Sequence, residues 1–363
     1  MGDGLTVGRR RYRSGNPGSN PGPPAGPNRR GQGVPAPRPL ISTPGFGPVS
    51  FDRSTDIANG TAAFQSCAHG QSTTFGLAPM NILPLERQTA VVSALVEGCS
   101  IRTTERLTQT HRDTVMRLGA RIGRGCDALH DFMFRELQIS QLQFDELWAF
   151  IGKKQKRVKK GDAASAGDKY TFLALDALNK AIVSYRCGKR DGATTLEFVQ
   201  DVRARVVGAP MISSDAFAAY EPTIRYVFGD NCHYGQIVKN YAAEQSVNAA
   251  RRYSPAAVVS VKKHRVIGFM PGFLTSTSHV ERSNLSVRIA SRRFTRLTNG
   301  FSKKVENHEA AVALFVAHYN LCRVHETLRM APAMALGLTD RPWSVAELIQ
   351  VAERMLETEA RAH

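Results

Sequence analysis

The chain has 363 residues, of which 42% are hydrophobic, and carries a formal net charge of +17. This length allows one large or two modest cores, and the excess of Lys and Arg predicts a polyanionic partner, most commonly nucleic acid. No apolar run reaches the roughly 18 residues that a membrane-spanning helix needs, and the six cysteines form no C-x-x-C pair. The sequence therefore argues against a membrane protein, a disulfide framework and a zinc site, and predicts a cytoplasmic protein.

Residues 1–79 differ in composition from the rest of the chain. They contain 11 of the 18 prolines and 14 of the 30 glycines. Such a segment cannot bury enough apolar surface to offset the entropy lost on ordering, so we predict that it is disordered. The first patterned segment opens at Met80, and we interpret Met80 as the true translation start and residues 1–79 as an over-extended reading frame.

Residues 80–125 have the periodicity of three short helices, with Ser100 and Thr110 as the expected caps of the second and third. A tight turn before a basic third helix is typical of a helix-turn-helix DNA-binding domain. The positions expected to face inward are Val115, Leu118 and Ile122. The positions expected to face outward, toward DNA, are Arg112, Thr114, Arg117 and Arg121. An ordinary helical bundle with a charged face remains the alternative.

The pattern changes after residue 126. Strands are predicted at 142–150, 170–177, 181–188 and 209–215, with a helix at 194–208 before the last of them. This order predicts an α/β domain over residues 126–335, with a mixed sheet flanked by helices. Residues 230–278 are less regular, contain one predicted strand at 256–268, and are interpreted as an insertion. A long helical region is expected from residue 279 onward, followed by a C-terminal helix within 336–363.

Three acids occupy unusual positions in these predicted elements. Asp145 lies in the middle of a predicted apolar strand, where a charge is costly without a partner. Asp215 ends another predicted strand, and Glu281 is the one carboxylate among seven Arg and Lys residues in 279–304. If the two strands are neighbours, Asp145 and Asp215 converge, and a helix across their ends would bring Glu281 to the same place. Such a set suits two Mg²⁺ (or Mn²⁺) ions acting on a phosphodiester, with the surrounding arginines on the DNA backbone.

Each acid also has a simpler interpretation. Asp145 would pair with the lysines that follow its strand. Asp215 would cap the N-terminus of the next helix. Glu281 would be a first-turn acid that complements the helix dipole. The residues alone leave these alternatives open.

Several motifs resemble one known family. They are SALVEGCSIRTTERLTQTHRDTVMRLG, QFDELWAFIGKKQK, ISSDAFAAYEP and STSHVERSNLSVRIASRRFTRLTNGFSKK, and they follow one another along most of residues 80–345. In this order they resemble bacterial insertion-sequence transposases of the DDE type, in the IS-one-like family. The resemblance implies an RNase H-like catalytic domain with a metal-binding triad of Asp145, Asp215 and Glu281. Asn284 matches the E-R-x-N motif of the family.

The chain also departs from that family. Smaller relatives carry a zinc-binding segment before the helix-turn-helix, and no metal-ligand spacing is visible here. The segment between Asp215 and Glu281 is longer than in compact members, in agreement with an insertion. Residues 1–79 match nothing in the family.

The predicted function is that of a transposase that binds the terminal inverted repeats of a mobile element and carries out metal-dependent cleavage and strand transfer. The partner would be double-stranded DNA, bound by a homodimer or larger oligomer in the bacterial cytoplasm and nucleoid. The alternatives are a domesticated helix-turn-helix regulator without catalysis and an endonuclease without strand transfer. Further DNA contacts are predicted at Arg282, Asn284, Arg288, Arg292 and Arg293.

Overall fold

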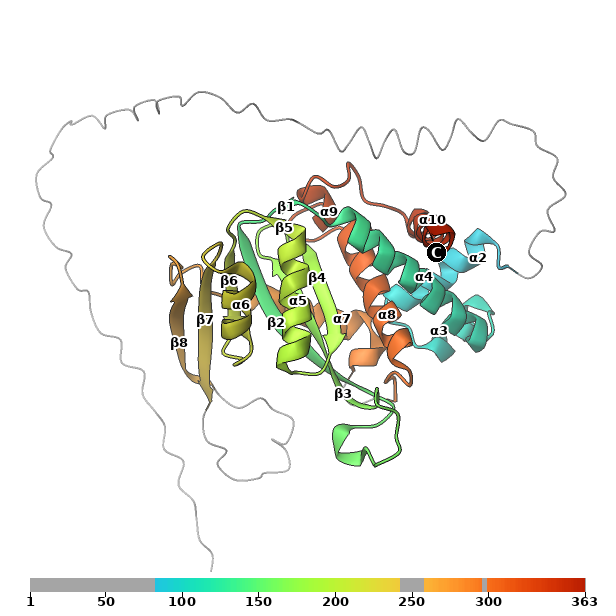
Figure 1. Cartoon of the computed structure of the whole chain (residues 1–363). Coiled ribbons are helices and arrows are strands. Elements are labelled where there is room, and N and C mark those ends of the chain that lie inside the picture. Colours follow the sequence, from blue (N-terminus) through green and yellow to red (C-terminus); the bar gives the residue numbers. More distant parts are fainter. Residues whose placement is uncertain (1–81, 242–257, 296–298, 363) are drawn as a thin grey trace, which may run out of the picture. The chain divides into compact units, whose positions relative to one another are not determined.

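The computed structural model describes residues 82–241, 258–295 and 299–362, all within one compact unit (Figure 1). The prediction for residues 1–79 lies outside this part of the chain. The helices are α2 (Leu85–Val96), α3 (Ile101–Thr108), α4 (Arg112–Met133), α5 (Gly192–Arg205), α6 (Tyr220–Phe228), α7 (Ser278–Ala290), α8 (Val305–Ala317), α9 (Pro332–Ala335) and α10 (Val345–Ala362). The strands are β1 (Leu137–Gln138), β2 (Gln141–Ile151), β3 (Gly167–Asp176), β4 (Ile182–Gly188), β5 (Val206–Val207), β6 (Met211–Asp215), β7 (His233–Tyr241) and β8 (Val258–Ile267). In these residues no helix is both long and apolar enough to cross a bilayer.

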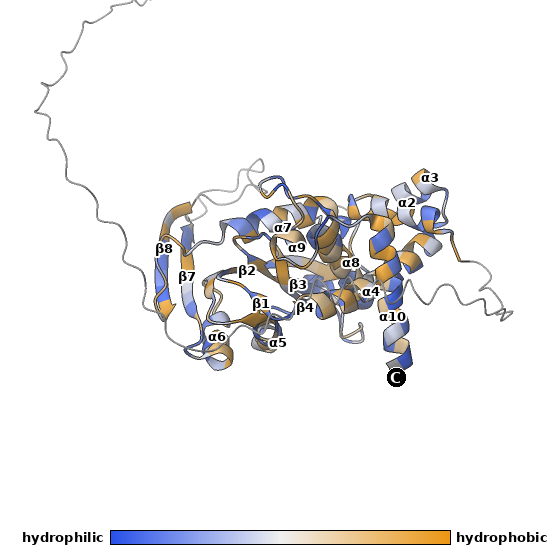
Figure 2. Cartoon of the chain, turned by 90° about the horizontal axis from the view of Figure 1, so that it is seen from above, coloured by the Kyte–Doolittle hydropathy of each residue, from blue (hydrophilic) through white to orange (hydrophobic). Residues whose placement is uncertain are grey.

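The centre of the fold is a mixed sheet with the strand order β4-β3-β2-β6-β7-β8. β2, β6 and β7 run parallel to one another, whereas the outer pairs are antiparallel. Helices α5 and α6 cover one face of the sheet and α7 lies on the other (Figure 2). The predicted mixed sheet flanked by helices is therefore confirmed, and one contiguous apolar core joins it to the helices on both sides.

The segment expected as an insertion, 230–278, extends this sheet. Its second strand, β8, agrees with the predicted strand at 256–268, whereas β7 was not predicted. The sequence of β7 lacks a clear apolar alternation because Gly235 and polar residues interrupt it. A Cβ atom on Gly235 would lie 2.9 Å from the Met270 side chain, so the loop after β8 covers this strand where its own side chains do not.

Helix α4 is longer than the sequence predicted. It passes residues 123–125, where two glycines favoured an end, and continues to Met133. A Cβ atom on Gly123 would lie 2.1 Å from the Ala310 carbonyl oxygen, and one on Gly125 would lie 2.1 Å from that of Ala352. The glycines therefore allow α8 and α10 to pack directly on α4, and the expected domain boundary at 125/126 falls inside a continuous helix.

Of the two helix caps predicted from the sequence, the structure confirms one and replaces the other. Ser100 caps α3, since its side chain accepts a hydrogen bond of 3.1 Å from the Thr103 N–H. Thr110 does not cap α4, because His111 takes that position and its Nδ1 accepts from the Asp113 N–H at 3.3 Å. The three residues predicted to face inward are buried, as expected: Val115, Leu118 and Ile122.

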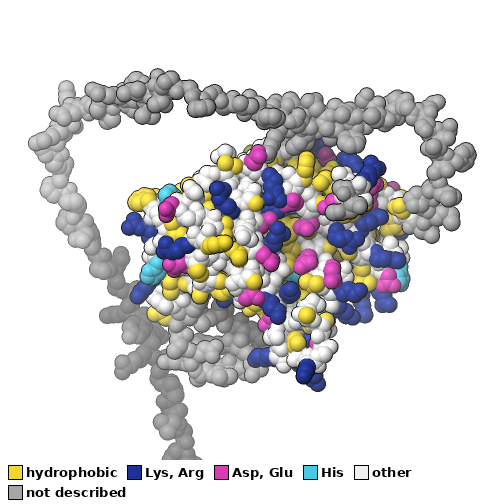
Figure 3. Space-filling view, viewed as in Figure 1, with side chains coloured by type: hydrophobic (Ala, Val, Ile, Leu, Met, Phe, Trp, Pro, Cys, Tyr) yellow, Lys and Arg dark blue, Asp and Glu magenta, His cyan; other side chains and the backbone are white. Residues whose placement is uncertain are grey.

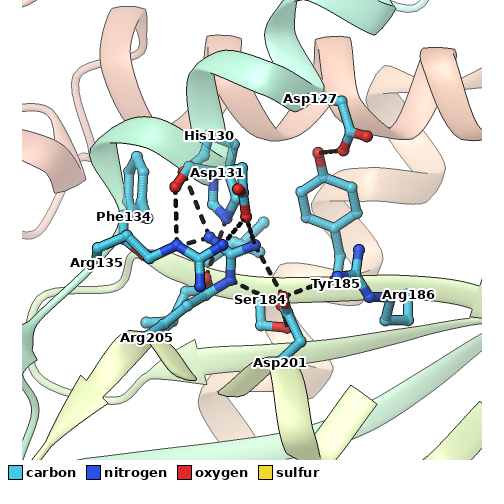
Figure 4. A network of polar contacts seen from close by, with 12 residues as sticks. Asp127, His130, Asp131, Phe134, Arg135, Ser184, Tyr185, Arg186, Asp201 and Arg205 are labelled. Atoms are coloured by element: carbon cyan, nitrogen blue, oxygen red, sulfur yellow. Dashed lines mark hydrogen bonds and ion pairs between the residues drawn. The ribbon is translucent and has the colours of Figure 1, made fainter. Parts of the chain in front are cut away.

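A buried polar network ties α4 to the sheet and to α5 (Figure 4). The Arg205 guanidinium donates to Asp201 at 2.7 Å and to Asp131 at 2.9 Å. Ser184 of β4 donates to the same Asp201 at 2.6 Å. His130 lies beside this network, and burial lowers its pKa to about 3, so the ring is neutral. Every charge in the network thus has an opposite partner, which is the condition for burying an ion pair without a large penalty.

The long helical region expected from residue 279 onward is interrupted. α7 ends at Ala290, and Ser291 adopts an extended backbone before the short turn η4 (Arg292–Phe294). Phe294 is buried, so the chain leaves the helix to place this side chain in the core. The next helix, α8, begins at Val305, and its C-terminal half, residues 312–317, is buried, while Ala310 packs on Gly123 of α4.

Candidate active site

Three carboxylates meet where the C-terminal end of β6 lies beside the middle of β2. Asp145, Glu146 and Asp215 each offer an oxygen atom, and these oxygens all lie within 4.8 Å of one another. The parallel register of the two strands explains the convergence. Gln143 pairs with Ser213, so Asp145 and Asp215 stand two residues further along neighbouring strands. The structure thus brings together two of the acids singled out in the sequence, with a third that was not.

Asp145 faces α7. Its carboxylate accepts a hydrogen bond of 2.6 Å from the Asn284 side-chain amide. Burial is the main cause that raises the pKa of Asp145 to about 6, and the charges of Asp215 and Glu281 raise it further. A proton therefore binds to this carboxylate more readily than to an exposed one.

Glu146 faces the opposite side of the sheet, toward α6. Its side chain is only 3% exposed and accepts hydrogen bonds from the Tyr220 hydroxyl and, at 3.0 Å, from Arg190. Burial raises its pKa to about 7, and the charge of Asp215 adds to the effect. Glu146 was not among the predicted site residues, although strand alternation places it on the same face as Phe144 and Trp148. A carboxylate on such an apolar stripe was the available signal.

Asp215 is the most accessible of the three acids, with a side chain that is 44% exposed. One oxygen accepts the Phe217 N–H at 3.0 Å, and the other lies 3.3 Å from Arg190. The Arg190 guanidinium stacks on the Phe217 ring at 4.1 Å. Arg190 therefore bridges Glu146 and Asp215 and offsets part of the negative charge of the cluster.

Helix α7 is fixed over these strands by its N-terminus. The Gln143 side-chain oxygen accepts from the backbone N–H groups of His279 and Val280 at 2.9 and 3.0 Å. Just before the helix, the Ser276 N–H donates to the Ser213 hydroxyl of β6 at 3.3 Å. Two neighbouring strands thus hold the start of α7, through residues that lie two positions before Asp145 on β2 and two positions before Asp215 on β6.

Glu281 lies in the first turn of α7, one turn before Asn284. Its carboxylate forms an ion pair with Lys239 of β7 and accepts a hydrogen bond of 2.6 Å from the Thr277 hydroxyl. It is therefore not part of the three-acid cluster in this structure. It lies close enough for its charge to raise the pKa of Asp145, so the helix does bring Glu281 to the border of the site.

The outward residues of α4 divide into two groups. Arg112 and Arg117 are exposed, and Thr114 is half-buried. Arg121 donates to Glu353 of α10 at 2.7 Å and to Gln88 of α2 at 3.3 Å. Arg121 thus has internal partners that join α4 to its neighbours, whereas Arg112 and Arg117 remain accessible to a ligand.

The basic residues around α7 divide in the same way. Arg282 and Arg292 are exposed, and Arg288 is half-buried. Arg293 is turned inward, where it donates to the Ser302 hydroxyl at 2.9 Å and burial lowers its pKa. Asn284 is 3% exposed and bonded to Asp145. Both side chains therefore point into the protein in this structure, and the contact of Arg293 and Asn284 with DNA stays a prediction.

Comparisons with known proteins add similarities of structure only. No family model matches the sequence, and neither does any curated protein. A piggyBac transposase in a synaptic complex with hairpin DNA is similar over 85% of this chain and 78% of that chain, with 11% identity and a TM-score of 0.34. Mos1 transposase in a paired-end complex with the left transposon end is similar over 52% of this chain and 68% of that chain, with 13% identity and a TM-score of 0.17. The Mos1 strand transfer complex is similar over 72% and 84%, with 13% identity and a TM-score of 0.19. At these values the similarity assigns no family, and the resemblance to insertion-sequence transposases stays a prediction.

Proposed function

We propose that the chain is a DDE-type transposase that binds the ends of a mobile element, cleaves DNA there and joins the freed ends to a target. The observation that carries this proposal is the convergence of Asp145 and Asp215 on neighbouring parallel strands, beneath a basic helix that bears Glu281. In this proposal the sheet and its helices form the RNase H-like catalytic domain, and α2, α3 and the start of α4 form the helix-turn-helix.

The residues at the site fit a hard divalent cation. All the candidate ligands offer oxygen, which Mg²⁺ and Mn²⁺ prefer. Asn284 supports this fit, because its side-chain oxygen is buried and has no partner among the described residues. Asp145, Asp215 and Glu281 would hold two such ions. When bound there, they would supply Lewis-acid stabilisation of the charge that develops on a phosphodiester.

The residues of the chain would set up this chemistry. Asn284 holds the Asp145 carboxylate in one orientation through its hydrogen bond. Arg190 balances the charge of Glu146 and Asp215. Lys239 is the partner that Glu281 would have to leave in order to reach the other two acids. Glu146, which lies on the other face of β2 with Tyr220 and Arg190, would support the site rather than complete it.

DNA would be bound at two places. The exposed Arg112 and Arg117 would enter the groove at a terminal repeat, as a recognition helix does. Arg282, the residue after Glu281 on α7, would contact the backbone of the strand that is cut, and Arg292, beyond the other end of that helix, would contact it further along. Because two element ends must be brought together, the active form would be a dimer or larger oligomer on DNA.

The test incubates the full chain with a duplex that carries the sequence flanking its gene, in the presence of Mg²⁺, Mn²⁺ or EDTA. Strand breaks at the element end should appear only with the divalent ions and should be followed by joining to a second DNA. A sequence-specific footprint without metal-dependent breakage would instead assign a DNA-binding regulator. Breakage without joining would assign an endonuclease.

A further inference from the structure

Strand β8, at the edge of the sheet, is strongly basic. Between Val258 and Ile267 it carries Lys262, Lys263 and Arg265 and no carboxylate. All three side chains are exposed. Figure 3 shows Lys and Arg side chains along this edge of the molecule. The function proposed above gives these charges no role.

Two of the three cations lie on the face of the sheet that carries α7. In β7, Ile237 pairs with Lys263 and Gly235 pairs with Arg265, and paired residues share a face. The Lys263 ammonium donates at 2.8 Å to the carbonyl of Gly272, in the loop that leads into α7. A Cβ atom on Gly235 would also meet this loop, at Thr275. Lys263 and Arg265 therefore lie on the same side as Asp145 and Glu281.

The register connects this basic face to the acids. Asp215 pairs with Ile237, and Ile237 pairs with Lys263, so the three residues form one row across the sheet. Neighbouring strands lie about 4.8 Å apart, which places the backbone of Lys263 about 10 Å from that of Asp215. One DNA strand advances about 3.4 Å per nucleotide along the helix axis, so a row of this length parallel to the axis spans about three nucleotides.

The loop between β8 and α7 places two aromatic side chains on the surface beside these cations. Phe269 is 67% exposed and Phe273 is 82% exposed. Exposed aromatic rings beside cations are typical of surfaces that bind single-stranded nucleic acid, on which unpaired bases stack while the cations hold the backbone. A small inorganic anion has no apolar face that could contact these rings. The surface therefore fits an extended polyanion with apolar faces.

We infer that the α7-side face of β8, with Lys263, Arg265 and the loop that bears Phe273, holds the DNA backbone a few nucleotides from the phosphate that reacts at the acids. This inference rests on the proposed function, since it needs DNA at those acids. Basic residues on an edge strand have a rival role, which is to prevent edge-to-edge pairing with a second copy of the chain.

The test compares two double variants of the full chain that lose the same charge. Lys263→Ala with Arg265→Ala removes the basic face of β8. Arg354→Ala with Arg361→Ala removes two exposed cations from α10, a helix with four Glu residues and therefore no excess of positive charge. Binding to a fluorescein-labelled duplex of about forty base pairs is measured by anisotropy between about 50 and 200 mM KCl. Light scattering reports the oligomeric state of each variant.

For wild type, log K should fall steeply with log [KCl]. The β8 variant should bind more weakly, with a slope reduced by about two, whereas the α10 variant should keep the wild-type slope. The Lys263→Gln, Arg265→Gln variant, which keeps much of the aliphatic stems, should show the same reduction. Unchanged affinity and slope in both β8 variants would overturn the inference alone, and self-association with unchanged DNA affinity would assign the cations to edge protection. Absence of salt-dependent binding by wild type would overturn the proposed function as well.

Discussion

Asn284 of α7 donates a hydrogen bond of 2.6 Å to Asp145 of β2, across 139 residues of sequence. The bond joins the helix that carries Glu281 to the strand that carries the most deeply buried aspartate of the cluster. Gln143, two residues earlier on β2, binds the N-terminus of the same helix. The position of α7 over the acids is therefore set by side chains of the strand itself.

Replacing Asn284 should impair the site without unfolding it. Asn284→Ala removes the hydrogen bond that lowers the pKa of Asp145, so this pKa should rise above about 6. Loss of a partner that orients a metal ligand typically lowers metal affinity about 10–100-fold. The acidic limb of the pH profile of cleavage should move to higher pH, and the half-saturating Mn²⁺ concentration should increase. Ser286→Ala, on the same helix, should change neither quantity, and an unshifted profile in Asn284→Ala would exclude the positioning role.

Metal binding should depend on pH. The pKa values of Asp145 and Glu146 are raised to about 6 and about 7. A raised carboxyl pKa favours the protonated folded state, so the metal-free protein should lose stability as the pH rises through this window. Metal ions require the deprotonated ligands, so the increase in Tm caused by Mn²⁺ should be small near pH 5.5 and large near pH 8. Thermal unfolding with Mn²⁺ or EDTA measures this, and a pH-independent increase would contradict the assignment.

Glu281 and Glu146 should differ in their effect on chemistry. Glu281→Gln removes the acid on the α7 side and should lower cleavage by about a thousandfold, with DNA binding retained. Glu146→Gln keeps a side chain able to bond Tyr220 and Arg190 and should lower cleavage far less. Both variants are compared by nicking of an end-bearing duplex with Mn²⁺ and by gel shift. The reverse order of effects would assign the third ligand to Glu146, which the structure places in the cluster.

The buried Arg205 should be important for stability. Arg205→Ala leaves Asp201 in the core without its main cation, which typically costs about 3–5 kcal/mol. Arg225→Ala removes a surface pair with Glu221 and should cost about 1 kcal/mol or less. Urea unfolding of both variants gives the two values. Equal losses would show that the network between α4, β4 and α5 adds nothing beyond a surface ion pair.

Local patterns in the sequence predicted most of the sheet. The expected strands at 142–150, 170–177, 181–188, 209–215 and 256–268 correspond to β2, β3, β4, β6 and β8. Each has enough apolar or β-branched residues to show its period. β7 was missed because a loop from elsewhere in the chain covers it, and α4 was predicted too short because its glycines pack against α8 and α10. In both cases the decisive contacts are with distant residues.

The candidate site could be predicted only in part for the same reason. Asp145 and Asp215 were recognisable because an acid on or at the end of an apolar strand needs a partner. Glu146 was recognisable by the same criterion and was overlooked. Two interactions at the site depend on how segments far apart in sequence are placed. These are the ion pair of Lys239 with Glu281 and the bridge that Arg190 forms between Glu146 and Asp215. A local sequence pattern does not predict that placement.

The most direct test of metal-dependent cleavage at these acids is to measure nicking and binding of one end-bearing duplex by Asp145→Asn. This change keeps the shape of the side chain but removes a charge that a divalent ion needs. Cleavage with Mg²⁺ or Mn²⁺ should fall by about a thousandfold or more, while the affinity for the duplex stays at the wild-type level or rises. Cleavage close to the wild-type rate by a folded Asp145→Asn protein would contradict the proposed active site.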